Sequence, residues 1–297
     1  QAIIMQAARS PVTLLCKWLE QRLPPESAAW FSEQFQKLQK GAPERDLYIA
    51  LGYAIRKLGK ADLALGPAEL DEAQSVRPGW NPGDWSIDQA ARLAFVLADG
   101  LDGQAFKNRI EQLFRTADIG ELITFYRGLP LYPNPELHVA RAREGTRSAM
   151  QPIFEAVAHR NPYPKEQFDE NAWNHMVLKA LFIGSRLDPI DGLDQRANPR
   201  LMRMLCDYAH ERWAAGRPVS PELWRCVGPH ADANAVADLE RVLTTGNAVE
   251  RQAAALALAA APIPSAGEVL AKNPGLARAA KAGELSWSAI ANAAVQA

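Results

Sequence analysis

Apolar residues recur along most of this chain at intervals of three and four, which is the pattern of a helix with one buried face. Near the start this spacing runs through residues 3–22, 27–40 and 43–58, with only short links between them. Short links favour antiparallel neighbours. No segment shows a convincing run of alternating β-branched residues, so the sequence predicts an all-α protein without a sheet.

The same pattern predicts further helices, each marked by a capping residue or proline near its start, or by glycine or proline at its end. They cover residues 67–76, 86–97, 102–115, 118–128, 135–150, 153–159, 169–184, 198–216, 220–225, 232–243, 247–261, 265–272 and 286–295. The later helices are short and are linked through glycine or proline, which indicates stacked helical hairpins of HEAT-like type. Because no strict repeat period is present, we expect an irregular α-solenoid.

Two helices in the middle of the chain differ from ordinary surface helices. At about 100° per residue, residues 169–184 and 198–213 are apolar around almost their whole circumference. Asn174 nevertheless points into the apolar arc of the first helix, and Arg212 points into that of the second. A buried amide or guanidinium needs hydrogen-bond partners. We therefore expect both helices to lie inside the protein, with polar groups around these two side chains.

The polar residues of these helices and of the link between them form the candidate binding site or buried polar cluster. They are Asn174, His175, Lys179, Arg196, Asp207, His210, Glu211 and Arg212. The link also carries Asp188, Asp191 and Asp194 close to Arg186, so a structural network of salt bridges and amides is the favoured interpretation. The competing interpretation is a ligand pocket lined by the same groups. No residue is assigned a catalytic role.

Motifs of known chemistry are mostly missing from the sequence. Neither a glycine-rich phosphate loop nor a nucleophile elbow occurs. His210 and Glu211 begin like a zinc-protease helix, but Ala214 stands where the second histidine is required. His175 and Lys179 fit an ordinary helix edge better than an acid–base pair. No metal site and no cofactor is predicted, and a metal assembled from distant histidines and carboxylates is a disfavoured alternative.

Composition narrows the class of protein. The 297 residues include 33 basic and 34 acidic side chains, a net charge of −1, which argues against a nucleic-acid or anionic-membrane surface. Three widely spaced cysteines suit a reducing compartment. No apolar run is long enough to span a membrane, and the first residues lack the order of a secretory signal, so we expect a cytoplasmic protein.

Several runs within the central region are similar to one known family. Asn161–Pro164, Phe168–Glu170, Ala172–Asn174, Met176–Ala180 and Asp207–Trp213 together resemble the EboA family, helical proteins of bacterial gene clusters associated with metabolite traffic. The resemblance extends from the region of Trp18 to about Pro229 and weakens in the Ala-rich tail. It implies an EboA-like helical domain over residues 1–229. Residues 230–297 are expected to form HEAT-like C-terminal helices continuous with it.

The resemblance implies a process, the handling or export of a secondary metabolite, rather than a reaction. The favoured hypothesis is a non-enzymatic binding or scaffold protein, with a small apolar or aromatic metabolite or other proteins of the same cluster as partners. One alternative is an enzyme that modifies a small metabolite in a polar pocket around Asn174, Asp207 and Arg212. Another is a solenoid that only binds proteins, which would show an exposed apolar groove.

Overall fold

The structure is a computed structural model that describes residues 10–296. Within that range the chain is helical, apart from turns, loops and isolated bridge residues such as the antiparallel pair Asp62 and Ser86. The predicted all-α class is therefore confirmed for the described residues. The part of the first predicted helix that precedes residue 10 lies outside them. Contacts divide the chain into two compact units, one ending at Gln167 and the other beginning at Phe168.

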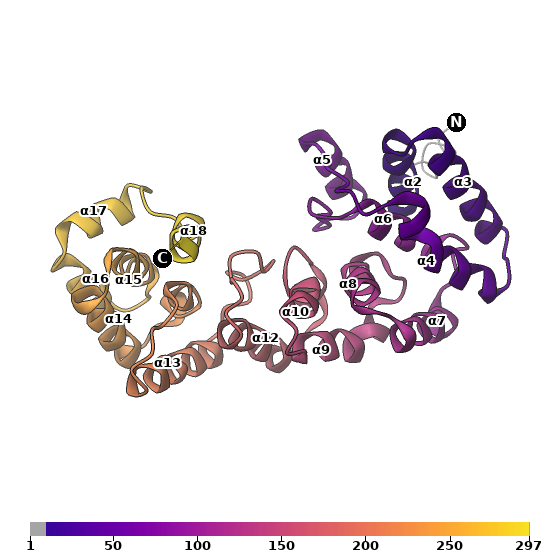
Figure 1. Ribbon diagram of the computed structural model, residues 1–297. Coiled ribbons are helices and arrows are strands. Elements are labelled where there is room, and N and C mark those ends of the chain that lie inside the picture. The colour runs from indigo at the N-terminus through magenta and orange to yellow at the C-terminus, as the bar shows by residue number, and fades with distance from the viewer. Residues whose placement is uncertain (1–9, 297) are drawn as a thin grey trace. The chain divides into compact units, whose positions relative to one another are not determined.

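The first unit is built from short helices joined mostly by short turns, with longer links at residues 59–66 and 77–86 on either side of α5 (Figure 1). These are α2 (Pro11–Arg22), α3 (Pro25–Gln39), α4 (Glu44–Leu58), α5 (Pro67–Val76), α6 (Ile87–Leu97), α7 (Gly103–Thr116), α8 (Ile119–Arg127), η1 (Leu129–Leu131), η2 (Pro135–His138), α9 (Val139–Arg147), α10 (Gln151–Ala158) and α11 (Tyr163–Gln167). The caps expected from the sequence are present at several of them. At the start of α8, for example, the Glu121 amide donates to the Asp118 carboxylate at 2.8 Å.

Helix α6 forms the centre of the first unit. It packs against α2, α3, α4 and α8, and Figure 1 shows it beside α2 and α4. Nearly all of its side chains are buried, including those of Asp88 and Arg92, one helical turn apart. The Arg92 Nε donates to the Leu51 carbonyl of α4 at 3.3 Å, and its Nη1 lies 3.8 Å from the Asp88 carboxylate. This buried pair was not predicted, although its i,i+4 spacing in an apolar helix was visible in the sequence.

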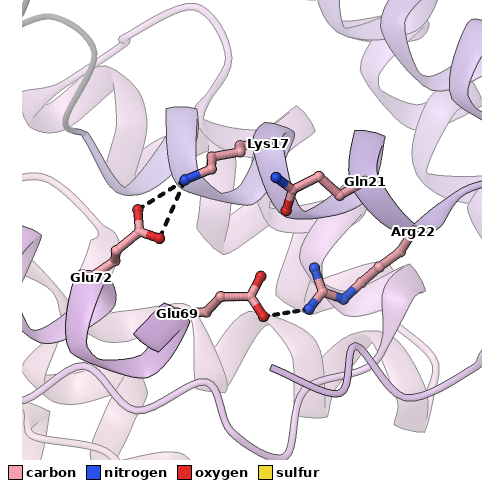
Figure 2. Close-up of a pocket in the computed structure, with 5 residues that line it drawn as sticks. All are labelled: Lys17, Gln21, Arg22, Glu69 and Glu72. Carbon is pink, nitrogen blue, oxygen red and sulfur yellow. Dashed lines mark hydrogen bonds and ion pairs between the residues drawn. The ribbon is translucent and has the colours of Figure 1, made fainter. Parts of the chain in front are cut away.

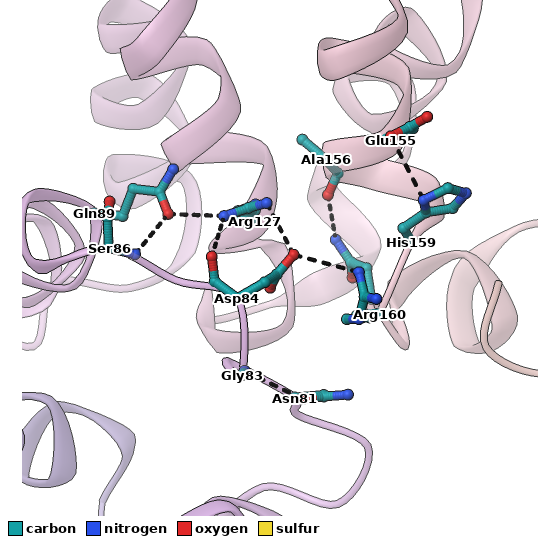
Figure 3. Close-up of polar contacts among 11 residues, drawn as sticks. Asn81, Gly83, Asp84, Ser86, Gln89, Arg127, Glu155, Ala156, His159 and Arg160 are labelled. Atoms are coloured by element: carbon teal, nitrogen blue, oxygen red, sulfur yellow. Dashed lines mark hydrogen bonds and ion pairs between the residues drawn. The ribbon is translucent and has the colours of Figure 1, made fainter. Parts of the chain in front are cut away.

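The turn between α10 and α11 depends on one buried amide. The Asn161 Nδ2 donates to the Tyr126 carbonyl at 3.2 Å and to the Ala156 carbonyl at 3.1 Å, and its Oδ1 accepts from the Tyr163 amide at 3.0 Å. Beside it, Asp84 reaches Arg127 at 3.0 Å and Arg160 at 3.5 Å (Figure 3). These contacts tie the loop before α6 to α8 and to the turn.

The second unit contains α12 (Glu170–Phe182) and α13 (Pro199–Ala214), followed by shorter helices. These are η3 (Pro221–Cys226), η4 (Gly228–His230), α14 (Ala233–Thr245), α15 (Ala248–Ala260), α16 (Pro264–Ala271), α17 (Pro274–Lys281) and α18 (Trp287–Gln296). Helix α15 contacts every one of the others after α13, and Figure 1 shows α14, α16, α17 and α18 around it. Its small side chains permit this close packing, since Ala253, Ala254, Ala255 and Ala257 are fully buried.

Some helix boundaries differ from the expected ones. The helix predicted at 135–150 is divided into η2 and α9, and α10 begins at Gln151 after a break in which the Met150 amide donates to the Ser148 hydroxyl. The short helices α11 and α17 were not predicted, and residues 221–226 form a 3₁₀ helix. Local side-chain bonds of this kind compete with helical bonds, and periodicity does not detect them. The HEAT-like arrangement stays a prediction.

Candidate functional site

The predicted cluster begins with Asn174, whose side chain is 1% exposed. Its Nδ2 donates to the Asn198 Oδ1 at 3.2 Å, and the Asn198 Nδ2 donates to the Asn174 Oδ1 at 2.7 Å. Asn198 is also the N-cap of α13, because its Oδ1 accepts from the Leu201 amide at 2.9 Å. A reciprocal amide pair therefore joins the buried middle of α12 to the first turn of α13.

Arg196 lies at the same junction. Its guanidinium carbon is 5.0 Å from the centroid of the Trp173 ring, and its Nη2 donates to the Phe168 carbonyl at 2.9 Å. His175 is exposed and Lys179 half-buried on the outer strip of α12, where the Lys179 ammonium lies 5.7 Å from the centroid of Phe182. The structure thus brings together Asn174 and Arg196, while His175 and Lys179 lie toward solvent.

The other four predicted residues lie in the second half of α13. They follow Asn198 by nine to fourteen residues, which at 1.5 Å per residue is roughly 14–21 Å. Asp207, His210 and Glu211 are exposed, and Arg212 is half-buried with its Nε donating to the Pro218 carbonyl at 2.9 Å. The eight residues therefore form two groups rather than one enclosed cluster. Their role in binding stays a prediction.

An aromatic and cationic surface lies at this far end of α13. The His210 Nε2 donates to the Asp238 carboxylate of α14 at 2.7 Å, and the histidine ring stacks on Trp213 with centroids 5.7 Å apart. The guanidinium carbon of Arg241, also on α14, is 4.0 Å from the centroid of Trp213. Trp224 stacks on Trp213 from the interior and is itself buried. We call His210, Trp213, Asp238 and Arg241 the α13–α14 surface.

Sequence reasoning found only part of this surface. His210 was included, whereas Trp213 was assigned to the apolar face of its helix and the two α14 residues were not considered. Asp238 and Arg241 are three residues apart, a spacing that puts both on one side of α14. The pairing with residues about thirty positions earlier depends on how the two helices pack, so no local signal identifies it.

Cys206 lies one turn before His210 and is buried. Burial and the negative charge of the Asp238 carboxylate raise the pKa of the Cys206 thiol to about 12. The thiol is therefore protonated near neutral pH and is a poor nucleophile. Although a histidine and an aspartate lie near this cysteine, the group accordingly lacks the thiolate that nucleophilic catalysis requires.

A third polar group involves the link between α12 and α13. The buried Glu222 accepts from the Leu187 amide at 3.1 Å and from the Asp188 amide at 2.9 Å. Arg225 donates to the carboxylates of Asp188 at 2.9 Å and Asp194 at 2.8 Å. The expected partners of these aspartates were arginines on the link and on α12–α13. The structure supplies Arg225 of η3 instead, and the network fixes the link against that short helix.

Several surface hollows occur away from these groups. One lies between α2 and α5, with a volume of about 540 Å³, and its lining is charged (Figure 2). Two ion pairs cross it, Lys17 to Glu72 at 3.1 Å and Arg22 to Glu69 at 2.6 Å. The hydrogen bond from Arg22 holds the pKa of Glu69 below its usual value. Because the charges that line this hollow neutralise one another, it offers no unpaired charge to a ligand.

Two findings concern metals and membranes. Within residues 10–296, no three histidine, cysteine, aspartate or glutamate side chains gather in a way that could hold a metal ion. Over the same part of the chain, no helix has both the length and the apolar character required to cross a bilayer.

Comparison with known proteins identified a family. A family model described as metabolite traffic protein EboA matches residues 12–228, well over half of the chain. The matched region includes the Asn174–Asn198 pair and the α13 half of the α13–α14 surface, and it ends before α14. No curated protein and no solved structure matched the chain.

Proposed function

The chain belongs to the EboA family of metabolite traffic proteins, and from that membership we propose that it is a non-enzymatic binding protein. It holds a flat aromatic metabolite with an acidic group while that metabolite passes between other proteins of the same gene cluster. The family description supports traffic as the process. The α13–α14 surface supports the class of ligand.

The observation that carries this proposal is the stacking of charged and aromatic planes at Trp213. The Trp213 ring stacks on the buried Trp224 and also contacts the guanidinium of Arg241, and the side chain of His210 is 56% exposed beside it. Planar guanidinium and imidazole groups stack on aromatic rings, and a guanidinium also pairs with carboxylates. A flat acidic ligand can therefore extend the stack and pair with Arg241 in the same position.

Binding is better supported than catalysis by the geometry of the polar groups. An enzyme that used Asn174 with Asp207 and Arg212 would need them around one pocket. Asn174 is instead paired with Asn198 at the start of α13, whereas Asp207 lies in the middle of that helix and Arg212 near its end. The buried thiol beside His210 is protonated. These polar groups therefore contribute to packing, and the α13–α14 surface is the accessible place where a ligand can stack.

The remaining parts of the proposal concern architecture and location. The family match ends at residue 228, close to the limit of 229 proposed for the EboA-like domain, and the Ala-rich helices that follow are proposed as HEAT-like hairpins. Contacts favour continuity at this point, because α13 packs against α14 across it. The free cysteines at positions 16, 206 and 226 support a reducing compartment, and we assign the protein to the cytoplasm.

Calorimetry with simple aromatic acids tests the proposed ligand class. We expect 1-naphthoate to bind more tightly than the neutral 1-naphthamide, because only the acid pairs with Arg241. Arg241→Ala is expected to weaken naphthoate binding by about 1–2 kcal/mol, roughly 5- to 30-fold, and to leave naphthamide binding less affected. Trp213→Leu is expected to weaken both.

Arg203→Ala is the matched control, because Arg203 is an exposed arginine of α13 that takes no part in the stack. Circular dichroism of each variant confirms that the helices are intact. Absence of naphthoate binding, or equal losses in the Arg203 and Arg241 variants, contradicts the proposed site.

A further inference from the structure

Helix α4 has an unusual outer face. Its inner face is formed by Leu47, Ala50, Leu51 and Ala54, all buried against the first unit. On the solvent side, where polar residues are expected, Tyr48, Ile49 and Tyr53 are 40%, 41% and 45% exposed. Three large apolar side chains exposed within six residues of one helix form a patch, and such patches on monomers often mark interaction surfaces.

The patch has a low centre and raised sides. At about 100° per residue, Ile49 and Gly52 lie near the middle of the outer face, with Tyr48 on one flank and Tyr53 on the other. A Cβ atom added to Gly52 would meet nothing within 4 Å, so the space above this glycine is open. We call these four residues the α4 saddle. A glycine at its centre permits the backbone of another element to approach closely.

Positive charge lies at both ends of the α4 saddle. Arg45 precedes it by about one turn and Arg56 follows it by about one turn, and both fall on the middle of the outer face. They are eleven residues apart, or roughly 16 Å along the axis. Both are exposed, and neither has a hydrogen bond or ion pair within the described part of the chain.

The acidic residues of the same helix do not balance these arginines. Glu44 is paired with Arg109 of α7 at 2.8 Å. Asp46 lies in the first turn of α4, where a carboxylate is favoured by the helix dipole. An apolar centre with an unpaired cation at each end is complementary to an apolar surface with carboxylates at matching positions.

We propose that the α4 saddle docks an amphipathic helix of a partner protein. The helix lies along α4, places a small apolar residue over Gly52 between the two tyrosines, and carries carboxylates about three turns apart that pair with Arg45 and Arg56. A helix fits because the feature is about three turns long and runs parallel to a helix axis. The inference concerns residues 45–56 only, and it is independent of the metabolite site on α13 and α14.

Fluorescence anisotropy with designed peptides tests this docking. The probe is a labelled, Leu- and Ala-rich helical peptide of about 18 residues with two glutamates eleven positions apart, and its counterpart carries lysines at those positions. The full chain is expected to bind the glutamate peptide at least 10-fold more tightly than the lysine peptide. Arg45→Glu combined with Arg56→Glu is expected to reverse that preference.

Gly52→Gln separates docking from folding. The new side chain points into open space and replaces a glycine in a helix interior, so the thermal midpoint of the protein is expected to hold or rise. Because glutamine fills the centre of the α4 saddle, binding of the glutamate peptide is expected to fall at least 10-fold. Lys37→Glu, an exposed charge reversal on α3, is the control and is expected to leave binding within about 2-fold.

Two further measurements identify a different occupant. If sedimentation shows that the wild type is a dimer and that Gly52→Gln is a monomer, the occupant is a second copy of this chain and the proposal is overturned. If the protein binds vesicles of anionic phospholipid and does not bind the glutamate peptide, the occupant is a membrane surface and the proposal is also overturned. Equal binding of the two peptides, or unchanged binding in Gly52→Gln, also overturns it.

Discussion

Replacing Asn198 with alanine removes three contributions that meet in one side chain. Asn198 caps α13 through the Leu201 amide, it supplies both hydrogen-bond partners of the buried Asn174 amide, and its Nδ2 also donates to the Arg196 carbonyl at 3.1 Å. Asn247 offers a matched comparison, because it caps α15 through the Glu250 amide at 2.9 Å and is exposed. Asn198→Ala and Asn247→Ala therefore each lose an asparagine N-cap, but only Asn198→Ala leaves a buried amide without its partner.

The expected magnitudes follow from these contacts. Loss of an asparagine N-cap costs about 1 kcal/mol. An unsatisfied buried amide costs about 1–3 kcal/mol more, so Asn198→Ala is expected to lower the free energy of unfolding by about 2–4 kcal/mol. Asn247→Ala is expected to cost about 1 kcal/mol. In a background that already carries Asn174→Ala, the Asn198 substitution is expected to cost about 1–2 kcal/mol, because only the cap and the hydrogen bond to the Arg196 carbonyl are then lost.

Urea unfolding followed by circular dichroism measures these changes. Because the chain has two compact units, the fit must allow two transitions. Hydrogen exchange on peptides from α12 and α13 then assigns the loss to the second unit. Equal costs for Asn198→Ala and Asn247→Ala, or strict additivity in the double variant, would refute the reasoning that Asn174 depends on Asn198.

Three further predictions concern packing, pH and thiol chemistry. Gly228→Ala is expected to lower the thermal midpoint of unfolding, because the new Cβ would lie 2.6 Å from the Ala257 carbonyl oxygen. Gly267→Ala on α16, which has open space around it, is expected to raise the midpoint slightly. Calorimetry of both variants checks this pair of predictions. The hydrogen bond from Arg225 lowers the pKa of Asp194 below 3.8, so the stabilisation it gives is present above that pH and is lost as pH falls through the folded-state pKa. Arg225→Gln should therefore destabilise the protein more at about pH 6 than at about pH 3, and an equal loss at both would contradict this. Burial raises the pKa of Cys226 to about 12, so a disulfide reagent at about pH 8 is expected to modify it only after urea is added, and fast labelling in the native protein would count against the structure.

Several features of the fold followed from the order of residues alone. The spacing of apolar side chains was enough to predict an all-α chain, because a helix shows its buried face in sequence at every turn. The burial of Asn174 was also predictable, since its direction on α12 lies inside an apolar arc that must be covered. Start signals such as Asn198–Pro199 placed α13 correctly for the same local reason.

The choice of partners was decided only by tertiary structure. Asn174 is bound by Asn198, His210 by Asp238, and both Asp188 and Asp194 by Arg225, in each case across more than twenty residues of chain. A sequence shows that a buried polar group needs a partner but not which of several arginines, carboxylates or amides the packed helices bring within hydrogen-bond distance. Packing of α13 against α14 put Arg241 over Trp213 and so formed the stacking surface on which the proposed function depends.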